Sequence, residues 1–136
     1  MTTRPTASVT DQDYRNLLAL RTALRQFLHW SEQRAQAAGL TPAQHQLLLA
    51  VRGHDGAAAP TIGDIAAHLL LRHHSAVGLV DRAEEAGLVV RRRDDDDRRI
   101  VRVALTAKGD RVLESLSADH LDEIRRLGLM RVVSPT

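Results

Sequence analysis

The period of the apolar residues changes from helical to alternating at Gly87, and this change constrains the fold more than any other feature. Before Gly87, apolar residues recur every three or four positions, which indicates amphipathic helices. After it, the stretch LVVRRR is β-branched and then charged, and IVRVAL alternates between apolar and polar residues. Two such runs on either side of the polar segment DDDD predict a β-hairpin with a charged tip. We therefore expect a mainly helical chain that carries one small hairpin.

Threonines mark the starts of several expected helices. Thr41 and Thr61 are followed, three residues later, by Gln44 and Asp64, whose side chains can return a hydrogen bond to the backbone of the cap. Thr106 precedes the last apolar run, and a glycine follows the first, fourth and last runs, as is common after a helix. The expected helices cover residues 11–38, 42–52, 62–70, 74–86 and the stretch between Thr106 and Gly128.

The order of these elements predicts a winged helix-turn-helix. Helices 62–70 and 74–86 are joined by the tight turn RHHS, which is typical of a helix-turn-helix, and the hairpin that follows takes the position of a wing. The expected fold class is mainly α with a small β-hairpin wing.

The composition excludes several classes of function. Without cysteine, the chain has no disulfide, no thiolate redox centre and no cysteine zinc site. No apolar run reaches the roughly 18 residues of a membrane span, and the first residues lack the apolar core of a signal peptide, so we expect a cytoplasmic protein. A G-x-S-x-G motif and a phosphate-binding glycine loop are absent, so we do not expect an enzyme. The net charge is only +2, but residues 91–111 hold eight basic and five acidic residues, so the basic excess lies at the hairpin.

Four segments of the sequence together resemble a known family. They are LTPAQHQLL, TIGDIAAHL, SAVGLVDRAEEAGLVVR and DDRRIVRVALTAKG, which lie between residues 40 and 109. The combination of EEAGLVVR with D-x-R and L-T-x-K-G is similar to the MarR family of winged helix-turn-helix transcription regulators. The resemblance implies a homodimer with interlocking N- and C-terminal helices. It also implies that each subunit places a recognition helix in the major groove of double-stranded DNA and a wing in the adjacent minor groove.

The same resemblance divides the chain into functional segments. We expect a disordered lead at 1–10, an N-terminal dimerisation helix at 11–39, the DNA-binding lobe at 40–105, and a C-terminal dimerisation helix with a tail at 106–136. Family members usually have further helical sequence beyond the position of Gly128. The dimer is therefore expected to rest on the two flanking helices alone, or to be weaker than usual.

The start of the helix after the RHHS turn should face DNA, because the N-terminal residues of a recognition helix reach base edges. Histidine and serine can donate to purine acceptors or to phosphate, and valine can touch a thymine methyl group. The alternative is that the two histidines only fill a surface turn. The residues expected to bind DNA are His73, His74, Ser75, Val77, Gly78 and Arg82, with Arg72 as a candidate for a phosphate contact.

The expected wing tip carries the family pattern Asp-x-Arg on Asp97 and Arg99. The resemblance implies that Arg99 enters the minor groove, where the negative potential attracts a guanidinium. Asp97 would hold the wing by pairing with Arg99 or with an arginine of the first strand. Arg98 is a second candidate for the minor groove or a phosphate, and Arg93 is a candidate for a phosphate contact.

The three aspartates before Asp97 do not fit a DNA-binding tip, because carboxylates near phosphates are unfavourable. We interpret Asp94, Asp95 and Asp96 as a solvated turn, since aspartate tolerates tight-turn backbone angles. A calcium loop needs spaced oxygen ligands and a glycine at its bend, and this run has neither. If the three aspartates face DNA, neutralising them should tighten binding.

Phe27 and Trp30 in the first helix have two interpretations. They line a small-molecule pocket between the dimer helices and the DNA-binding lobe, as often in the family, or they belong to the dimer core, which is favoured for Phe27. The family's usual ligands are small aromatic or phenolic acids, and we predict no cofactor and no metal. A zinc site would have to form across the dimer from His29, His45 or His120 with carboxylates, because no two histidines stand three or four residues apart.

Together these inferences predict a homodimeric, sequence-specific repressor that a ligand releases from DNA. Its operator should be pseudo-palindromic, with half-sites about one helical turn apart. Two alternatives stay open, namely a winged-helix module that binds proteins and no DNA, and a zinc-responsive regulator.

Overall fold

The order of helices and strands is the one that the sequence predicts. The computed structural model describes residues 8–128, so the expected tail and most of the expected lead lie outside the described residues. The elements are α1 (Asp11–Ala37), α2 (Pro42–Arg52), α3 (Ile62–Leu69), α4 (His73–Glu85), β1 (Val89–Arg93), β2 (Val101–Leu105) and α5 (Ala107–Leu127). They confirm the predicted mainly α class with one antiparallel hairpin as the wing.

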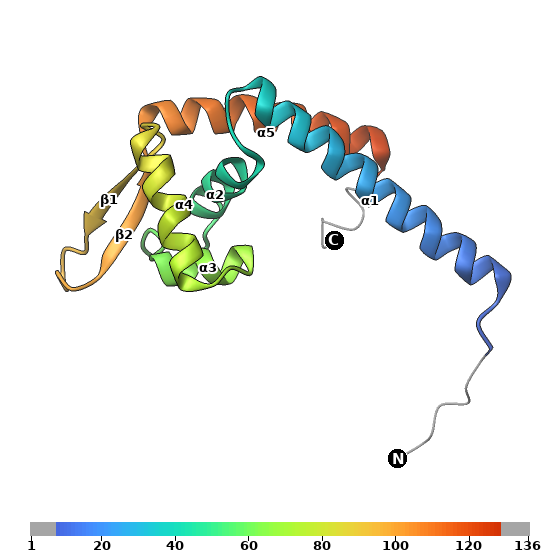
Figure 1. Cartoon of the computed structure of the whole chain (residues 1–136), viewed down its shortest axis with the longest axis horizontal. Helices are drawn as coiled ribbons and strands as arrows, with labels where there is room; N and C mark the ends of the chain where they lie inside the picture. Colours follow the sequence, from blue (N-terminus) through green and yellow to red (C-terminus); the bar gives the residue numbers. More distant parts are fainter. Residues whose placement is uncertain (1–7, 129–136) are drawn as a thin grey trace, which may run out of the picture.

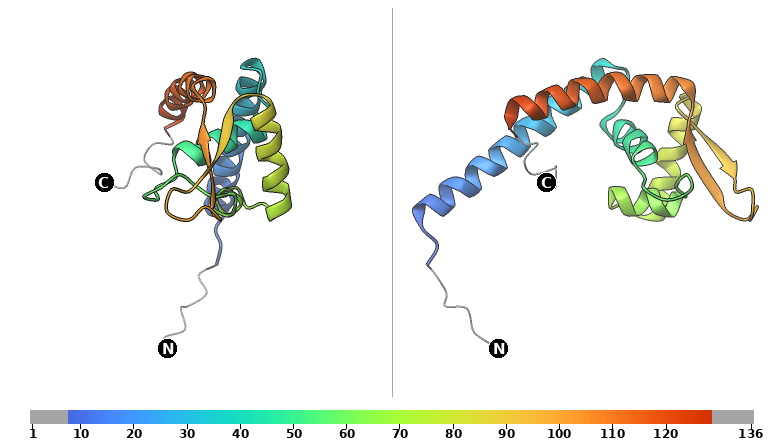
Figure 2. Two further views of the ribbon diagram at one scale, coloured as in Figure 1. Left: turned by 90° about the vertical axis from the view of Figure 1, so that its left-hand side faces the viewer. Right: turned by 180° about the vertical axis from the view of Figure 1, so that it is seen from behind.

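The described residues form a lobe and an arm. Figure 1 shows α2, α3, α4 and the hairpin gathered in the lobe, while α5 passes over them and runs along the C-terminal half of α1. The N-terminal half of α1 extends beyond the end of α5, as the right-hand view of Figure 2 also shows. None of the helices in residues 8–128 is long and apolar enough to cross a membrane.

Side-chain caps fix the helix starts as predicted. Thr41 Oγ1 accepts a hydrogen bond from Gln44 N at 3.1 Å, and Gln44 Oε1 accepts one from Thr41 N at 3.0 Å. Thr61 and Asp64 form the same reciprocal pair at the start of α3. Thr106 caps α5. Because each cap satisfies backbone N–H groups that the helix leaves open, it contributes about 0.5–2 kcal/mol to stability.

The turn between α3 and α4 differs slightly from the prediction. α3 stops at Leu69 and not at residue 70, because Leu70 adopts a left-handed backbone conformation with φ of 55°. α4 begins at His73 and ends at Glu85, one residue earlier than predicted at each end. The left-handed residue reverses the chain direction at once, and this keeps the helix-turn-helix tight.

The core lies where the helices of the lobe meet the hairpin and α5. Its largest fully buried aliphatic side chains are Leu47, Leu48, Ile65, Leu88, Val80, Val89 and Val103. Next to it, α5 approaches the start of β1 so closely that a Cβ on Gly109 would overlap the backbone oxygen of Leu88. Only glycine fits at this position, and this explains why the L-T-x-K-G segment ends in glycine. The contact seats the base of the wing against α5.

Both edges of β2 form backbone hydrogen bonds, one with β1 and the other with the segment before α3. Within the hairpin, the register runs from Val89 opposite Leu105 to Arg93 opposite Val101. On the other edge of β2, Val103 N donates to Pro60 O at 2.8 Å. The segment before α3 therefore holds the wing against the helix-turn-helix.

Candidate nucleic-acid interface

The first turn of α4 presents polar side chains to solvent. His73, His74 and Ser75 are all exposed. Arg72 is the N-cap residue, and it makes no side-chain capping bond. The first backbone N–H groups of α4 therefore have no side-chain cap, and such groups can receive a phosphate oxygen.

The other predicted residues of α4 lie deeper on the helix. Val77 and Gly78 are half-buried, whereas Arg82 is exposed. The guanidinium of Arg82 lies over Gly78, since a Cβ on Gly78 would be 3.2 Å from Arg82 Nη1. Val77 and Gly78 are therefore less open to a base than the first turn, and Arg82 lies along the helix where it can reach a phosphate.

A surface groove of about 420 Å³ joins the recognition helix to the wing. It is lined by Thr61, Ile62, Gly63, His73, Arg99, Ile100 and Val101. The start of α3, the start of α4 and the wing tip therefore open onto one surface. His73 and Arg99, which the sequence suggested on separate grounds, lie on this same groove.

Arg99 is held by Asp97 while facing solvent. Arg99 Nε donates to Asp97 Oδ1 and Arg99 Nη2 donates to Asp97 Oδ2, each at 3.0 Å, which is a bidentate pair. The side chain of Arg99 is 91% exposed. The hydrogen bond from Arg99 lowers the pKa of the Asp97 carboxyl. The predicted pairing of Asp97 with Arg99 is confirmed.

Asp94 has a structural role that the sequence did not predict. Its Oδ1 accepts a hydrogen bond from Arg102 Nε at 2.6 Å, and its Oδ2 accepts from Asp96 N at 3.1 Å and Asp97 N at 3.0 Å. Arg102 Nη1 in turn donates to Ala59 O at 2.7 Å. The prediction that Asp94 is only a solvated turn residue is wrong, because its carboxylate ties the wing tip to β2 and to the segment before α3.

We call the contacts of Asp94, Arg102 and Ala59 the wing strut. The side chains of Asp94 and Arg102 are only 17% and 24% exposed. The hydrogen bond from Arg102 lowers the pKa of the Asp94 carboxyl. Asp95 and Asp96, in contrast, are exposed, as a solvated turn predicts.

Two arginines of β1 are used within the lobe. Arg91 Nη2 lies 2.6 Å from Asp81 Oδ1, and Arg91 Nη1 lies 2.7 Å from Glu84 Oε1, which ties β1 to α4. Arg93 Nη1 donates to the backbone oxygen of Arg98 at 2.8 Å. The phosphate candidate Arg93 therefore has one donor committed to the wing, whereas the side chain of Arg98 is exposed.

A cavity of about 480 Å³ lies between α1, α2 and α5, and we call it the arm cavity. Its lining contains no Lys, Arg, Asp or Glu. The lining residues are Phe27, Leu28, Ser31, His45, Gln46, Leu49, Ser117, His120, Leu121 and Ile124. Phe27 lies on the wall, as one of its two interpretations expected. Trp30 does not, although its ring stacks on Phe27 with centroids 6.1 Å apart and lies 4.8 Å from the ring of His120.

Sequence reasoning missed the polar part of the arm cavity. His120 Nδ1 is 2.7 Å from Leu116 O, and its Nε2 is 2.7 Å from Ser31 Oγ. Because a carbonyl only accepts, Nδ1 donates to Leu116 O, and Nε2 shares a hydrogen bond with the Ser31 hydroxyl. The ring of His45 lies 4.7 Å from that of His120, and its buried Nδ1 has no hydrogen-bond partner within residues 8–128. Burial, together with the nearby His120, lowers the pKa of His45.

The zinc alternative lacks a complete ligand set within one chain. Although His45 and His120 are neighbours, both ring nitrogens of His120 already have partners. In the described part of the chain, no group of three or more His, Asp or Glu side chains could hold a metal ion.

The buried His45 predicts that acid destabilises the fold. A histidine whose pKa is lower in the folded chain binds fewer protons there than in the unfolded chain, so stability rises with pH. The contribution is therefore present above the ordinary value of 6.5 and is lost as the pH falls below it. We expect the free energy of unfolding to decrease from pH 7 to pH 5, with a slope from this group of at most ~1.4 kcal/mol per pH unit. Urea denaturation at a series of pH values measures this slope.

A variant isolates the contribution of His45. His45→Leu should flatten the dependence of stability on pH, while His29→Leu, which removes an exposed histidine from α1, should leave it unchanged. The same slope in wild type and His45→Leu would contradict the role given to His45.

Comparisons with known proteins agree with this architecture. A model of the MarR family matches residues 38–100. The chain is similar to AbsC, a MarR family transcriptional regulator from Streptomyces coelicolor, with 23% identity, a TM-score of 0.73 and coverage of 96% of this chain and 86% of AbsC. Another MarR family transcription regulator is 26% identical, with a TM-score of 0.70 and coverage of 92% and 79%. The MepR–DNA complex from Staphylococcus aureus gives 21% identity, a TM-score of 0.67 and coverage of 84% and 82%.

No curated protein matches the chain in sequence. The family match begins just after α1 and covers α2, the helix-turn-helix and the wing tip, while the structural similarity to AbsC covers 96% of the chain. Residues 38–100 therefore match the MarR family, and the fold of the chain is that of solved MarR family transcription regulators.

Proposed function

We propose that the protein is a DNA-binding transcription regulator, and not an enzyme, that contacts double-stranded DNA through α4 and the wing. The observation that carries this proposal is that the exposed residues His73 and Arg99 line one groove. The first turn of α4 would enter the major groove, and Arg99 would enter the adjacent minor groove. The similarity to MepR, whose structure was solved with DNA, supports the proposal.

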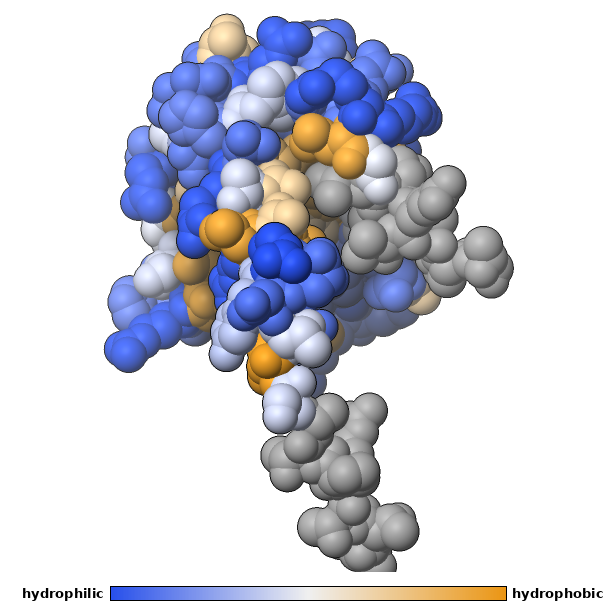
Figure 3. All heavy atoms as spheres, turned by 90° about the vertical axis from the view of Figure 1, so that its right-hand side faces the viewer, coloured by the Kyte–Doolittle hydropathy of each residue, from blue (hydrophilic) through white to orange (hydrophobic). Residues whose placement is uncertain are grey.

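We infer that two copies of the chain act together. Large apolar side chains of the arm are exposed in the single chain: Tyr14, Leu17, Leu18, Leu20, Leu24, Leu28 and Leu121. Figure 3, which views the molecule from the end of the arm, shows apolar patches between hydrophilic side chains. Apolar side chains gathered along one helix mark an interaction site, and a second arm would cover them. A dimer would also present two α4 helices to an operator with two half-sites.

Sedimentation equilibrium measures the oligomeric state directly. The expected mass is twice that of the 15.0 kDa chain at micromolar concentration. A single 15.0 kDa species under these conditions would contradict the dimer.

A titration with DNA separates this proposal from a winged-helix module that binds only proteins. The probe is a fluorescent fragment from upstream of the protein's own gene, and the control is a scrambled fragment of equal length. We expect tighter binding to the upstream fragment, with the logarithm of affinity falling linearly with the logarithm of salt concentration. Absence of binding to either fragment at low salt would favour the protein-binding module.

We further propose that a small ligand in the arm cavity releases the protein from DNA. The cavity combines apolar walls with polar side chains that include no Lys, Arg, Asp or Glu, namely Ser31, His45, Gln46, Ser117 and His120. Among them, the buried Nδ1 of His45 has no hydrogen-bond partner within residues 8–128. A phenolic hydroxyl can both donate and accept a hydrogen bond, so it suits either tautomer of neutral His45. A carboxylate would lose its hydration without meeting a fixed positive charge, which is unfavourable. These features support an uncharged phenol over the carboxylic acids that the family resemblance suggests.

Three ligands with the same ring test this choice, namely p-cresol, toluene and p-toluate. We expect p-cresol to displace labelled DNA at the lowest concentration, and His45→Leu to reduce its advantage over toluene. Stronger displacement by p-toluate would contradict the preference for an uncharged ligand. If none of the three displaces DNA that is otherwise bound, release through the arm cavity fails while DNA binding stands.

A further inference from the structure

A second pair of histidines lies in the lobe, away from the arm cavity and from the DNA-facing groove. His54 follows the C-cap of α2, and His68 lies in the last turn of α3. His54 Nδ1 is 2.9 Å from His68 Nε2, and the ring planes meet at 79°. One ring nitrogen from the loop after α2 and one from α3 therefore lie within hydrogen-bond distance of each other.

This distance fits two ligands of one metal ion. Imidazole nitrogens bind zinc at about 2.0–2.1 Å, so two of them at an angle of about 90–109° are separated by roughly 2.9–3.4 Å. The observed 2.9 Å lies at the square-planar or octahedral end of this range. An ion between the rings would replace the hydrogen bond, and each ring would turn so that its nitrogen points at the ion and not at the other nitrogen.

A carboxylate lies behind His54, on the side away from His68. Asp64 Oδ2 is 3.7 Å from His54 Nε2. The same oxygen accepts the capping hydrogen bond from Thr61 N at 3.0 Å, and this bond lowers the pKa of Asp64. A carboxylate beside the outer nitrogen of a histidine fixes the ring and makes its inner nitrogen a better ligand.

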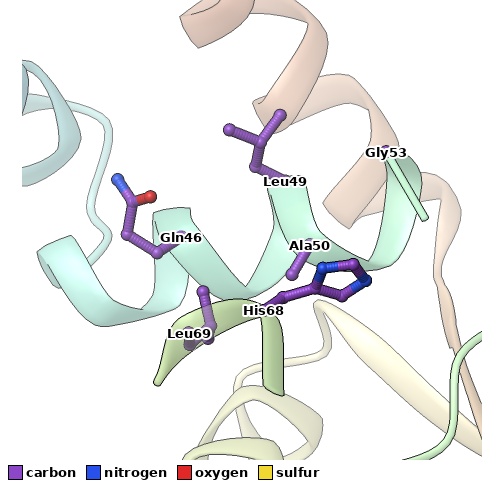
Figure 4. Close-up of a pocket in the computed structure, with 6 residues that line it drawn as sticks. All are labelled: Gln46, Leu49, Ala50, Gly53, His68 and Leu69. Atoms are coloured by element: carbon purple, nitrogen blue, oxygen red, sulfur yellow. The ribbon is translucent and has the colours of Figure 1, made fainter. Parts of the chain in front are cut away.

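The surroundings of His68 leave room for water ligands. His68 lines an open pocket of about 280 Å³ together with Gln46, Leu49, Ala50, Gly53 and Leu69. Figure 4 shows the His68 ring beside α2 near Ala50, and Gly53, the residue before His54, lines the same pocket. The lining contains no lysine or arginine that would repel a cation.

We propose that His54 and His68 chelate a divalent transition-metal ion of the class that prefers imidazole, with water completing its coordination. Copper, nickel and zinc belong to this class, and the order of affinity should place copper first. The ion would join the end of α2 to α3, the first helix of the helix-turn-helix. The site does not depend on the function proposed above, because it needs neither DNA nor a ligand in the arm cavity.

Isothermal titration of the full chain, prepared without a polyhistidine tag, tests the proposal with CuCl₂, NiCl₂ and ZnCl₂. We expect one ion per chain with micromolar affinity, tightest for copper. His54→Gln and His68→Gln should each abolish this binding, whereas His73→Gln and His74→Gln, on exposed histidines of α4, should retain it. Asp64→Asn keeps an oxygen for the cap but loses the charge, and it should weaken binding by roughly tenfold or more.

A spectroscopic measurement on the wild-type protein avoids any dependence on the folding of variants. Electron paramagnetic resonance with one equivalent of Cu²⁺ should show coupling to two imidazole nitrogens. Absence of heat with all three ions, Cu²⁺ without imidazole coupling, or unchanged affinity in folded glutamine variants would each overturn the proposal.

Discussion

Replacing Arg99 with alanine is expected to raise the dissociation constant for operator DNA by about tenfold or more, and by a similar factor for unrelated DNA. The side chain is 91% exposed and held by Asp97 on the groove that also contains His73. A guanidinium in the minor groove is attracted by the negative potential there, and this attraction depends little on the base sequence. Removing Arg99 should therefore weaken binding to any DNA. The dependence of affinity on salt should also become shallower, because fewer counterions are released.

Fluorescence anisotropy at four or five salt concentrations measures both effects of Arg99→Ala. Arg125→Ala is the matched control, because it removes an exposed arginine near the end of α5, where Arg125 pairs with Asp122. The control should bind like wild type. An unchanged affinity and salt slope in Arg99→Ala would remove Arg99 from the interface.

Neutralising Asp94 is expected to weaken DNA binding by roughly tenfold, even though it removes a negative charge from the wing. The loss follows from the wing strut: Asp94→Ala would release Arg102 and two backbone N–H groups of the tip. A mobile tip must be ordered again when it binds, and this costs affinity. Asp95→Asn and Asp96→Asn should instead tighten binding slightly, because these exposed aspartates hold no such contacts and only repel phosphate.

The same DNA titration distinguishes two roles for Asp94, a contact that holds the wing tip and a negative charge that repels phosphate. Arg102→Ala should weaken binding as Asp94→Ala does, and the double variant should be little worse than either single variant, because both remove the same contact. Tighter binding of DNA by Asp94→Ala would contradict the role of Asp94 in the wing strut and would favour the solvated turn that the sequence suggested.

Features that depend on neighbours in sequence could be predicted. The capping pairs of Thr41 with Gln44 and of Thr61 with Asp64 are set by spacing within one helical turn. The pairing of Asp97 with Arg99 is equally local. The change of apolar period at Gly87 predicted the hairpin for the same reason, since strand and helix differ in how far apart buried positions recur.

Features that depend on the packed fold could not be predicted. Arg102 meets Asp94 and Ala59 only because β2 pairs with β1 on one edge and with the segment before α3 on the other. His120 meets Ser31 and His45 only because α5 returns along α1. The alternation of residues along β2 predicted that Arg102 points away from the apolar face, but the neighbouring sequence did not indicate which residues it contacts.

The central claim is that α4 and the wing contact adjacent grooves of one DNA molecule, and hydroxyl-radical footprinting tests it most directly. With wild-type protein, we expect two protected half-sites about one helical turn apart, each flanked outside by a protected stretch of minor groove. In Arg99→Ala at saturating concentration, the half-sites should stay protected while the outer minor-groove protection is lost. Footprints of wild type and Arg99→Ala that are identical, or a wild-type footprint without paired half-sites, would contradict the account.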